Sequence, residues 1–325
     1  MIKKRVLVGY GGEYIKSVYR ERLADRFITV DVDAVSGWIN TRDGTPQNGT
    51  DVSRGIFGAT VGLERLLKLF NKHDIKATFF TPAHTIESFP EQLAKVKDAG
   101  HEIGLHGYTH EHISGLSATQ QRYVLAKSID VLTSFTGSKP KGYTAPAWDT
   151  SKELIPLLEE FGIIYDHSFM HHDLQPYFAP DGRHSWVETD VKKEASSWMK
   201  PMTKIKPSGI VEIPANWHVD DWPPLQPMPG RAGTIAQHGF ISTHELEKLW
   251  LEQFDYAYEE YDTFIFPMSI HAQVGGKPHV IKMHERIIEY INKHEGVEWM
   301  PLGDMATEFL EGRIAGVEIE GGVDN

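Results

Sequence analysis

Two histidines, His106 and His110, stand four residues apart in the stretch HEIGLHGYTH, close behind a short apolar run. Neutral imidazole is the commonest protein ligand for zinc and related divalent ions, and two imidazoles on adjacent turns of backbone can bind one ion. Two histidines alone do not make a site, because a histidine pair at a strand end can also be buried and satisfied by hydrogen bonds. The pair therefore predicts a metal site only if other parts of the chain supply a third ligand and a base.

Two aspartates and a further histidine, which follow other apolar runs, could complete such a site. Asp31 and Asp33 lie two residues apart in TVDVD, so on a regular strand they point to the same side. Like charges that close resist joint ionisation unless a cation neutralises one of them. One carboxylate with His106 and His110 would give three ligands and open positions for water and substrate, which is typical of catalytic zinc sites. The second carboxylate could act as base and His271 as general acid, a set that predicts a metal-assisted hydrolase of an amide or ester.

The elements that must position these residues alternate between short β-rich runs and amphipathic helices. This alternation predicts parallel strands joined by right-handed crossovers, and seven or eight such units favour one TIM-like barrel, whose catalytic residues collect at the C-terminal ends of the strands. The expected strands are 26–35, 75–82, 101–106, 141–146, 163–169, 209–217, 263–271 and 296–301. The expected helices are 58–74, 89–100, 117–137, 151–162, 242–261, 280–294 and 303–312, and residues 171–208 are expected to form a long loop.

No change of composition marks a linker, so we expect a single barrel domain over residues 26–312. Residues 1–25 precede the first barrel strand as an N-terminal extension whose structure the sequence leaves undecided. Residues 313–325 are expected to form a C-terminal tail. At the strand ends of this barrel Asp166 and Trp217 would join Pro146 and Trp148 around the mouth.

Composition and charge exclude several classes of function. The chain has 325 residues, no cysteine and a formal net charge of −12. An acidic surface repels phosphate backbones and anionic lipids, so we expect neither nucleic acid nor membrane as a partner. Without thiolates, any metal must be held by His, Asp, Glu or water. The apolar run near the N-terminus is too short for a signal peptide and no apolar stretch could span a bilayer, which favours a cytoplasmic protein.

The motif order TVDVD, HGYTH, GYTAPAW, YDHSF and MSIH resembles that of the polysaccharide deacetylases with a NodB-homology domain, from about residue 27 to about residue 310. The resemblance implies a distorted barrel of seven βα units, an α/β fold. It is strongest to an intracellular branch that contains allantoinase-like, cyclic-imide-hydrolase-like and peptidoglycan-deacetylase-like proteins. Relatives in that branch tend to be homo-oligomers, so a homo-oligomer is expected here.

The resemblance also implies roles for individual residues. Asp31 is the general base and Asp33 a metal ligand, together with His106 and His110. His271 is the catalytic acid. The remaining motif residues line the substrate site and include the backbone N–H that would hold the oxyanion, at Ala147; they are Pro146, Ala147, Trp148, Asp166 and Trp217.

The third motif departs from the family pattern. The family has an arginine there that orients the catalytic aspartate, but this chain has Thr144. The aromatic residue expected directly after the proline is Ala147, and Trp148 follows it. Asp31 is therefore expected to lack its usual orienting cation, while the three metal ligands and the acid are retained.

Three functions stay open at this stage. The first is removal of N-acetyl groups from amino sugars in chitin- or peptidoglycan-type substrates, and the second is hydrolysis of small cyclic amides such as imides, hydantoins or allantoin. The third is a non-catalytic binding protein, which only the lost arginine favours. Zn²⁺ is the expected metal, although a site of two histidines and one aspartate also accepts Co²⁺, Ni²⁺, Fe²⁺ or Mn²⁺.

Overall fold

The structure is a computed structural model that describes residues 23–40, 47–182, 190–198, 201–226 and 241–324. Its strands form one curved sheet in the order β6-β7-β5-β4-β3-β2-β1-β8, and β9 pairs with β1. All pairings are parallel except that of β6 with β7. The strands are β1 (Leu23–Asp31), β2 (Thr78–Thr81), β3 (Glu102–Leu105), β4 (Gly142–Tyr143), β5 (Tyr165–Asp166), β6 (Tyr177–Pro180), β7 (Pro207–Glu212), β8 (Thr263–His271) and β9 (Val297–Trp299).

An irregular segment that follows β7 connects that side of the sheet to β8. β7 makes no ladder with β8, but the chain that follows β7 forms an isolated parallel bridge between Asp220 and Ser269. The Asp221 N–H also donates a hydrogen bond to the Ser269 carbonyl, at 3.1 Å. The sheet is thus a distorted (β/α)7-type barrel in a single domain, as the alternating pattern predicts.

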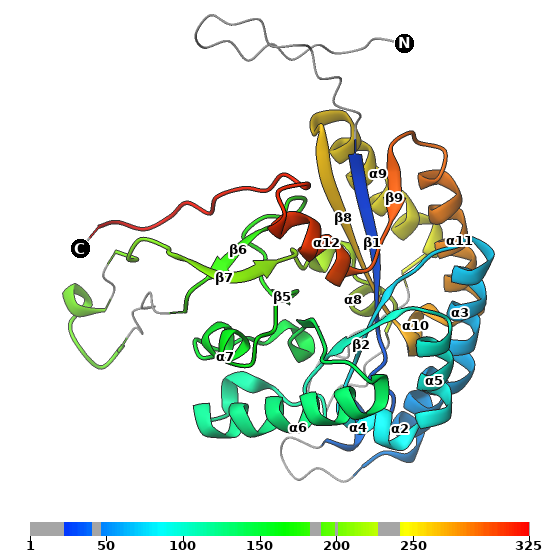
Figure 1. The fold of residues 1–325 in the computed structure, drawn as a ribbon, viewed down its shortest axis with the longest axis horizontal. Helices are drawn as coiled ribbons and strands as arrows, with labels where there is room; N and C mark the ends of the chain where they lie inside the picture. The colour runs from blue at the N-terminus through cyan, green and yellow to red at the C-terminus, as the bar shows by residue number, and fades with distance from the viewer. Residues whose placement is uncertain (1–22, 41–46, 183–189, 199–200, 227–240, 325) are drawn as a thin grey trace, which may run out of the picture.

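Helices cover the outside of the curved sheet (Figure 1). In Figure 1, α3, α5, α10 and α11 lie along one side, and α6 and α7 lie along another. The helices are α1 (Ser36–Ile39), α2 (Gly49–Phe57), α3 (Leu63–Lys72), α4 (Ala83–Ser88), α5 (Pro90–Asp98), α6 (Ala118–Thr136), α7 (Leu154–Glu160), α8 (Trp222–Leu225), α9 (Thr243–Glu260), α10 (Ala272–Gly275), α11 (Pro278–Ile291) and α12 (Leu302–Leu310). Helix α6 begins at the expected N-cap, Ser117, whose hydroxyl accepts the Gln120 N–H, and ends at Gly137 in the left-handed conformation.

Side chains of β1 alternate between the two faces of the sheet, which explains how a buried strand can lead into the carboxylates of Asp31 and Asp33. Ile28, Val30 and Val32 belong to the apolar layer between sheet and helices. Phe27, one residue out of phase, belongs to a second apolar cluster inside the barrel. Since successive side chains of a strand point to opposite faces, Asp31 lies on the same side as Phe27, facing the interior.

Helix α12 closes the end of the barrel opposite the carboxylates. Its residues Leu302, Met305 and Ala306 pack inside the barrel with Phe27 and other interior side chains. The Leu302 N–H donates to the Thr78 hydroxyl at 2.8 Å, which ties the start of the helix to β2. One end of the barrel is therefore filled with apolar side chains, and the polar mouth lies at the other.

The structure differs from the expected elements in several places, and the short helices α1, α4, α8 and α10 were not expected. Residues 171–208 are not only loop, because β6 lies there and pairs antiparallel with β7, which itself begins at Pro207. Helix α2 was not expected, and the predicted helix from residue 58 starts with a π-helical turn, Gly58–Gly62, before α3. β1 begins at Leu23 instead of residue 26, while residues 1–22 of the expected extension lie outside the described residues.

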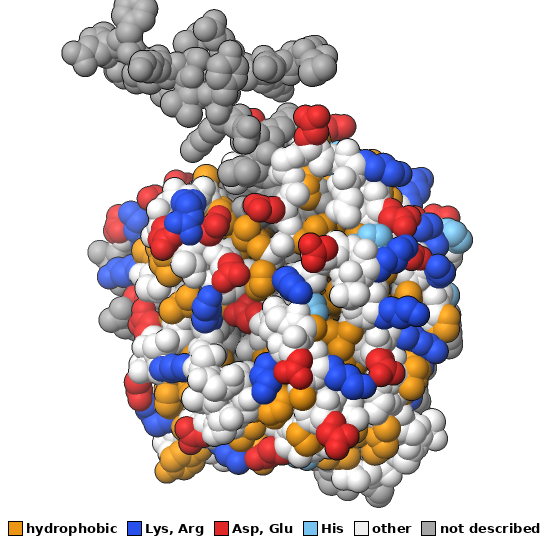
Figure 2. Space-filling model, turned by 45° about the vertical axis from the view of Figure 1, so that its right-hand side comes forward, with side chains coloured by type: hydrophobic (Ala, Val, Ile, Leu, Met, Phe, Trp, Pro, Cys, Tyr) orange, Lys and Arg blue, Asp and Glu red, His pale blue; other side chains and the backbone are white. Residues whose placement is uncertain are grey.

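Two features of the surface bear on the excluded partners. Acidic and basic side chains are interspersed on the face drawn in Figure 2, and no continuous basic area covers that face. Among the described helices, none is both long enough and apolar enough to cross a membrane.

Candidate metal centre and active site

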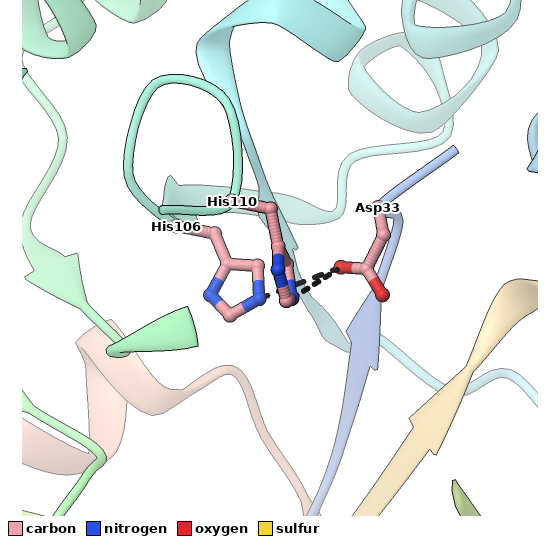
Figure 3. A group of neighbouring side chains, drawn as sticks. All are labelled: Asp33, His106 and His110. Carbon is pink, nitrogen blue, oxygen red and sulfur yellow. Dashed lines mark ion pairs between the residues drawn. The ribbon is translucent and has the colours of Figure 1, made fainter. Parts of the chain in front are cut away.

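Asp33, His106 and His110 converge at the mouth of the barrel (Figure 3). Asp33 Oδ1 lies 3.4 Å from His106 Nε2 and 3.7 Å from His110 Nε2. The ring centroids of the two histidines are 5.0 Å apart. All three side chains are largely buried, and the atoms that they offer face one another across a small space.

The donor atoms fit a divalent cation. His106 Nδ1 lies 2.9 Å from the Thr144 carbonyl oxygen and can only donate to it, so in the neutral ring Nε2 is the nitrogen whose lone pair faces Asp33. Asp33 Oδ1 is buried and, among the described residues, has no hydrogen-bond donor. A buried carboxylate oxygen that faces an imidazole nitrogen needs a positive charge between the two atoms, either a proton on the ring or a metal ion. Zinc–ligand bonds of about 2.0–2.2 Å at a tetrahedral angle put neighbouring ligand atoms about 3.4 Å apart, close to the separations here.

The charges around the site favour a cation in the same place. Burial alone would lower the pKa of His106, but the facing carboxylates of Asp31 and Asp33 raise it above its usual value. For Asp33 burial opposes ionisation, yet the neighbouring imidazoles of His110 and His106 lower its pKa well below the usual range. Burial lowers the pKa of His110 to about 4 and keeps that ring neutral, as a ligand must be.

A tight turn after β3 brings the two histidines together. Gly107 has φ of 68°, a conformation that glycine adopts without strain, and His110 itself has φ of 61°. The Glu111 carboxylate accepts the backbone N–H groups of Tyr108 and Thr109, at 2.9 and 2.7 Å. These bonds stabilise the turn, in which the His106 and His110 rings both point toward Asp33 (Figure 3).

Asp33 is held from two directions. Its carbonyl oxygen accepts hydrogen bonds from the Ser36 N–H and the Thr85 hydroxyl, at 3.0 and 2.9 Å. Gln273 Nε2 donates to Asp33 Oδ2 at 3.2 Å. Since Oδ2 is occupied in this way, Oδ1 is the oxygen that turns toward the imidazoles. Sequence reasoning missed Gln273, which follows the β8 histidine by two residues.

His271 at the end of β8 lies across the site from His106. His271 Nε2 is 3.6 Å from Asp31 Oδ2, and Asp31 Oδ2 is 3.8 Å from His106 Nε2. The ring N–H at His271 Nδ1 donates to Asp221 Oδ1 at 3.0 Å, and the same oxygen accepts the backbone N–H of His271 at 2.9 Å. Burial would lower the pKa of His271, but the carboxylates of Asp220, Asp221 and Asp31 together raise it well above its usual value. The ring therefore keeps a proton that Nε2 can present to the pocket.

Asp31 has the position of a base. Burial raises the pKa of its carboxyl group, and the neighbouring imidazoles of His106 and His271 act in the opposite direction. Within the described residues those two imidazoles are the only cationic groups that form an ion pair with it. Thr144, which stands where the family has arginine, donates its hydroxyl to the His167 carbonyl at 2.6 Å instead.

Aromatic side chains wall the pocket above these residues. Trp38, Trp148, Trp217 and Trp222 all line it, together with Asp31, Asp33, His110, Ala147 and His271. Trp148 and Trp217 meet edge to face with ring centroids 4.4 Å apart, and Trp38 stacks on Trp222 at 6.1 Å. Trp38 was not expected in the site, because no motif or spacing distinguishes it from the apolar residues of the core.

The backbone of the third motif is strained at the pocket. Ala147 and Trp148 are consecutive non-glycine residues in the left-handed conformation, with φ of 53° and 48°. Such conformations persist where the surrounding structure holds them, and they cluster at functional sites. Ala147 lines the pocket, whereas Pro146 is buried beneath it and is not among the lining residues.

The structure does not bring Asp166 to the pocket, contrary to the expectation. Tyr165 packs inside the barrel, so the next residue of β5 points to the outer side of the sheet. There the Asp166 side chain is fully buried and accepts a hydrogen bond from Ser168 Oγ at 2.9 Å. The expectation failed because it placed Asp166 at a strand end without settling which face it occupies.

Two other groups of side chains have the composition of metal sites. Asp220, Asp221 and His271 lie together, but the proton between His271 Nδ1 and Asp221 already fills that space. His73, Glu285 and Glu289 gather between α3 and α11, where Lys72 and Lys282 pair with the glutamates. Asp220 and His271 of the first group line the same pocket as Asp33, whereas the second group lies outside it.

Comparisons with known sequences place the chain among deacetylases. A sequence model described as polysaccharide deacetylase matches residues 57–165. The peptidoglycan deacetylase of Helicobacter pylori is 45% identical over 282 residues, which are 87% of this chain and 94% of that protein. The peptidoglycan deacetylase-like protein FGM2 of Gibberella zeae is 37% identical over 292 residues, 87% of this chain and 85% of that protein.

Solved structures share the fold. A structure from Mycobacterium smegmatis that is assigned to the polysaccharide deacetylases superposes with a TM-score of 0.75 at 24% identity, over 92% of this chain and 94% of that one. The Puue allantoinase superposes with a TM-score of 0.70 at 21% identity, over 90% of this chain and 92% of that one. At these identities the likeness shows the barrel and does not choose between substrates.

Proposed function

Because the chain belongs to the polysaccharide deacetylase family and is a hydrolase of carbon–nitrogen bonds other than peptide bonds, we propose that it removes acetyl groups from the N-acetyl amino sugars of peptidoglycan-type substrates. The observation that carries this proposal is the 45% identity to a peptidoglycan deacetylase over nearly the whole of both chains. Hydrolysis of small cyclic amides is supported only by a fold likeness at 21% identity. A silent binding protein is opposed by the acid, base and ligand set at the mouth.

Asp33, His106 and His110 would hold the divalent metal ion that this family requires, and we propose Zn²⁺ as that ion. When bound, the ion would polarise the amide carbonyl and make water a better nucleophile. Asp33 Oδ1 lies 3.4 Å from His106 Nε2 and 3.7 Å from His110 Nε2, separations that suit ligands of one ion. The orienting bond from Gln273 would keep the carboxylate in place for it.

The residues of this chain divide the proton transfers between two sides of the pocket. Asp31 takes a proton from the water that attacks the acetyl carbonyl carbon. The Ala147 N–H donates a hydrogen bond to the carbonyl oxygen as negative charge grows there. His271 gives its Nε2 proton to the sugar nitrogen as the carbon–nitrogen bond breaks. The products are acetate and a free amino sugar, and the four pocket tryptophans would exclude water around the sugar ring.

The test combines a metal assay with a substrate panel. Protein stripped with chelator and reloaded with zinc is expected to release acetate from N-acetylglucosamine oligomers or peptidoglycan fragments, and not to open allantoin, hydantoin or succinimide. His106→Ala should lose the metal. Asp31→Asn and His271→Ala should keep the metal and the fold but lower kcat by about 100-fold or more.

The control is His279→Ala, because His279 lies exposed on α11 outside the pocket. It should leave both metal content and acetate release unchanged. Full activity in Asp31→Asn would reject the assignment of the base. Turnover of a cyclic amide without acetate release from any sugar would replace the proposed substrate.

A further inference from the structure

A buried pair of carboxyl groups lies outside the pocket and has no part in the chemistry above. Asp166 of β5 and Glu212 of β7 are register partners on neighbouring parallel strands. Both side chains are fully buried, with 0% exposure. Within the described residues, no lysine or arginine forms an ion pair with either of them. Two neighbouring carboxylates without a counter-charge are strongly unfavourable in such surroundings.

Hydrogen bonds show where a proton between the two groups must lie. Asp166 Oδ1 accepts the Ser168 hydroxyl at 2.9 Å, and Glu212 Oε1 accepts the N–H groups of Ser168 and Phe169, each at 2.9 Å. Asp166 Oδ2 and Glu212 Oε2 are buried, and no described residue donates a hydrogen bond to them. Burial raises the pKa of Asp166 to about 7, and burial together with the Asp166 charge raises that of Glu212 well above its usual value. The two carboxyl groups are close enough to bond to each other, and Asp166 Oδ2 and Glu212 Oε2 are the oxygens that one shared proton would satisfy.

Ser168 links this pair to the strained backbone at the pocket. Its Oγ donates to Asp166 and accepts the Ala145 N–H, at 2.9 Å in each case. Ala145 lines the pocket and lies two residues before Ala147, whose left-handed backbone needs support from its surroundings. A donor that stabilises charge on a carbonyl oxygen must be held in place before the reaction to be effective.

We propose that Asp166, Glu212 and Ser168 form a positioning unit, in which a carboxyl pair with one shared proton fixes the Ser168 hydroxyl and thereby the backbone from Ala145 to Ala147. The three residues touch neither substrate nor metal and act only through Ala145. The proposal rests on the proposed function for the role of the Ala147 N–H. It does not depend on which N-acetyl sugar is the substrate.

The first experiment removes the link. Ser168→Ala should lower kcat for acetate release by about 10- to 100-fold, leave KM within about threefold, and leave the bound zinc unchanged. The Ala145 amide should exchange with deuterium at least tenfold faster in this variant, since its acceptor is gone. Ser168→Thr keeps a hydroxyl and should restore both values. The control is Ser128→Ala, a buried serine of α6 that bonds the Val124 carbonyl, and it should change neither.

The second experiment tests the shared proton. In Asp166→Asn the amide N–H can donate to Glu212 Oε2 while Oδ1 still accepts from Ser168, so kcat should stay within about threefold of wild type. Asp166→Ala removes both bonds and should behave like Ser168→Ala. Equal, large losses in Asp166→Asn and Asp166→Ala would overturn the shared-proton arrangement. Wild-type kcat and wild-type exchange at Ala145 in Ser168→Ala would overturn the unit as a whole.

These outcomes can be told apart from a failure of the proposed function. If the wild-type protein releases acetate from no sugar, the deacetylase proposal fails on its own. Deuterium exchange at Ala145 needs no substrate, so slow exchange in wild type and fast exchange in Ser168→Ala would still support the positioning unit. Equal exchange rates would contradict it.

Discussion

At the level of single residues, the site depends on which nitrogen of each histidine carries a proton. His106 donates its Nδ1–H to the Thr144 carbonyl, and His271 donates its Nδ1–H to Asp221. Both rings therefore present Nε2 to the pocket, yet they serve opposite purposes. His106 Nε2 faces Asp33 within the group of three ligands, whereas His271 lies outside that group and its ring bonds to the Asp221 carboxylate, which suits an acid.

Replacing Asp221 by asparagine tests the role of that carboxylate. Asn can still accept the two hydrogen bonds from His271, but it removes a negative charge that raises the pKa of the ring. The acid of the reaction must be protonated, so activity is lost as pH rises through its pKa. We expect Asp221→Asn to lower kcat by about tenfold or more and to move the alkaline limb of the pH–rate profile to lower pH.

The pH–rate profile of acetate release measures this shift directly. An unchanged alkaline limb would show that His271 is not the group that titrates there. A loss of bound zinc in Asp221→Asn would instead place this carboxylate among the metal ligands.

Motif order and strand ends were enough to group Asp31, Asp33, His106, His110 and His271 from the sequence. All five lie within one mouth in the structure. The residues that contact these five, such as Asp221 and Trp38, could not be identified from motifs or strand ends. Asp221 belongs to VDDWPP, an irregular segment whose place beside β8 depends on a bridge that no local pattern predicts. Trp38 follows β1 in the short helix α1, and only the folded barrel shows that it stacks on Trp222.

At the level of elements, the period-two pattern explains both a success and a failure. It places Asp31 inside the barrel opposite the apolar residues Ile28 and Val30, which face the helices. The same pattern turns Asp166 away from the mouth, because Tyr165 takes the interior position on β5. β5 has only two ladder residues, so the sequence shows no alternation long enough to decide its phase. β6 was missed for a similar reason, since it is short and lies within a stretch that several prolines interrupt.

The Asp166–Glu212 pair between β5 and β7 should make stability depend on pH. Both carboxyl groups have raised pKa values in the folded chain, about 7 for Asp166, against the ordinary value of 3.8 for an unfolded aspartate. Between these values the folded state binds more protons, so the free energy of unfolding falls as pH rises. Asp166→Asn should reduce this loss of stability with rising pH. The melting temperature of the variant minus that of wild type should therefore be about 3 °C or more higher at pH 8 than at pH 5.

Thermal unfolding of both proteins at the two pH values measures the effect. Asp98→Asn, at an exposed position, is the matched control and should shift equally at both pH values. The difference in melting temperature between Asp166→Asn and wild type should be larger at pH 8 than at pH 5. An equal difference at both pH values would contradict the raised pKa values.

At the level of the whole molecule, the fold gathers into one mouth the ends of strands that are far apart in the chain. β1 and β8 pair over their full length, which puts Asp31 beside His271 although 240 residues separate them. Alternating elements predicted this barrel, and family membership accounts for the hydrolase activity. The expectation of a homo-oligomer rests on resemblance alone and stays a prediction.

The central claim is that one divalent ion lies between Asp33, His106 and His110, with Asp31 and His271 beside it. Anomalous X-ray scattering at the zinc edge, from crystals of the zinc-loaded protein, tests it most directly. A single strong peak should lie about 2.0–2.2 Å from Asp33 Oδ1 and from Nε2 of both histidines. A peak at Asp220, Asp221 and His271, or no peak at the barrel mouth in fully loaded protein, would contradict the account.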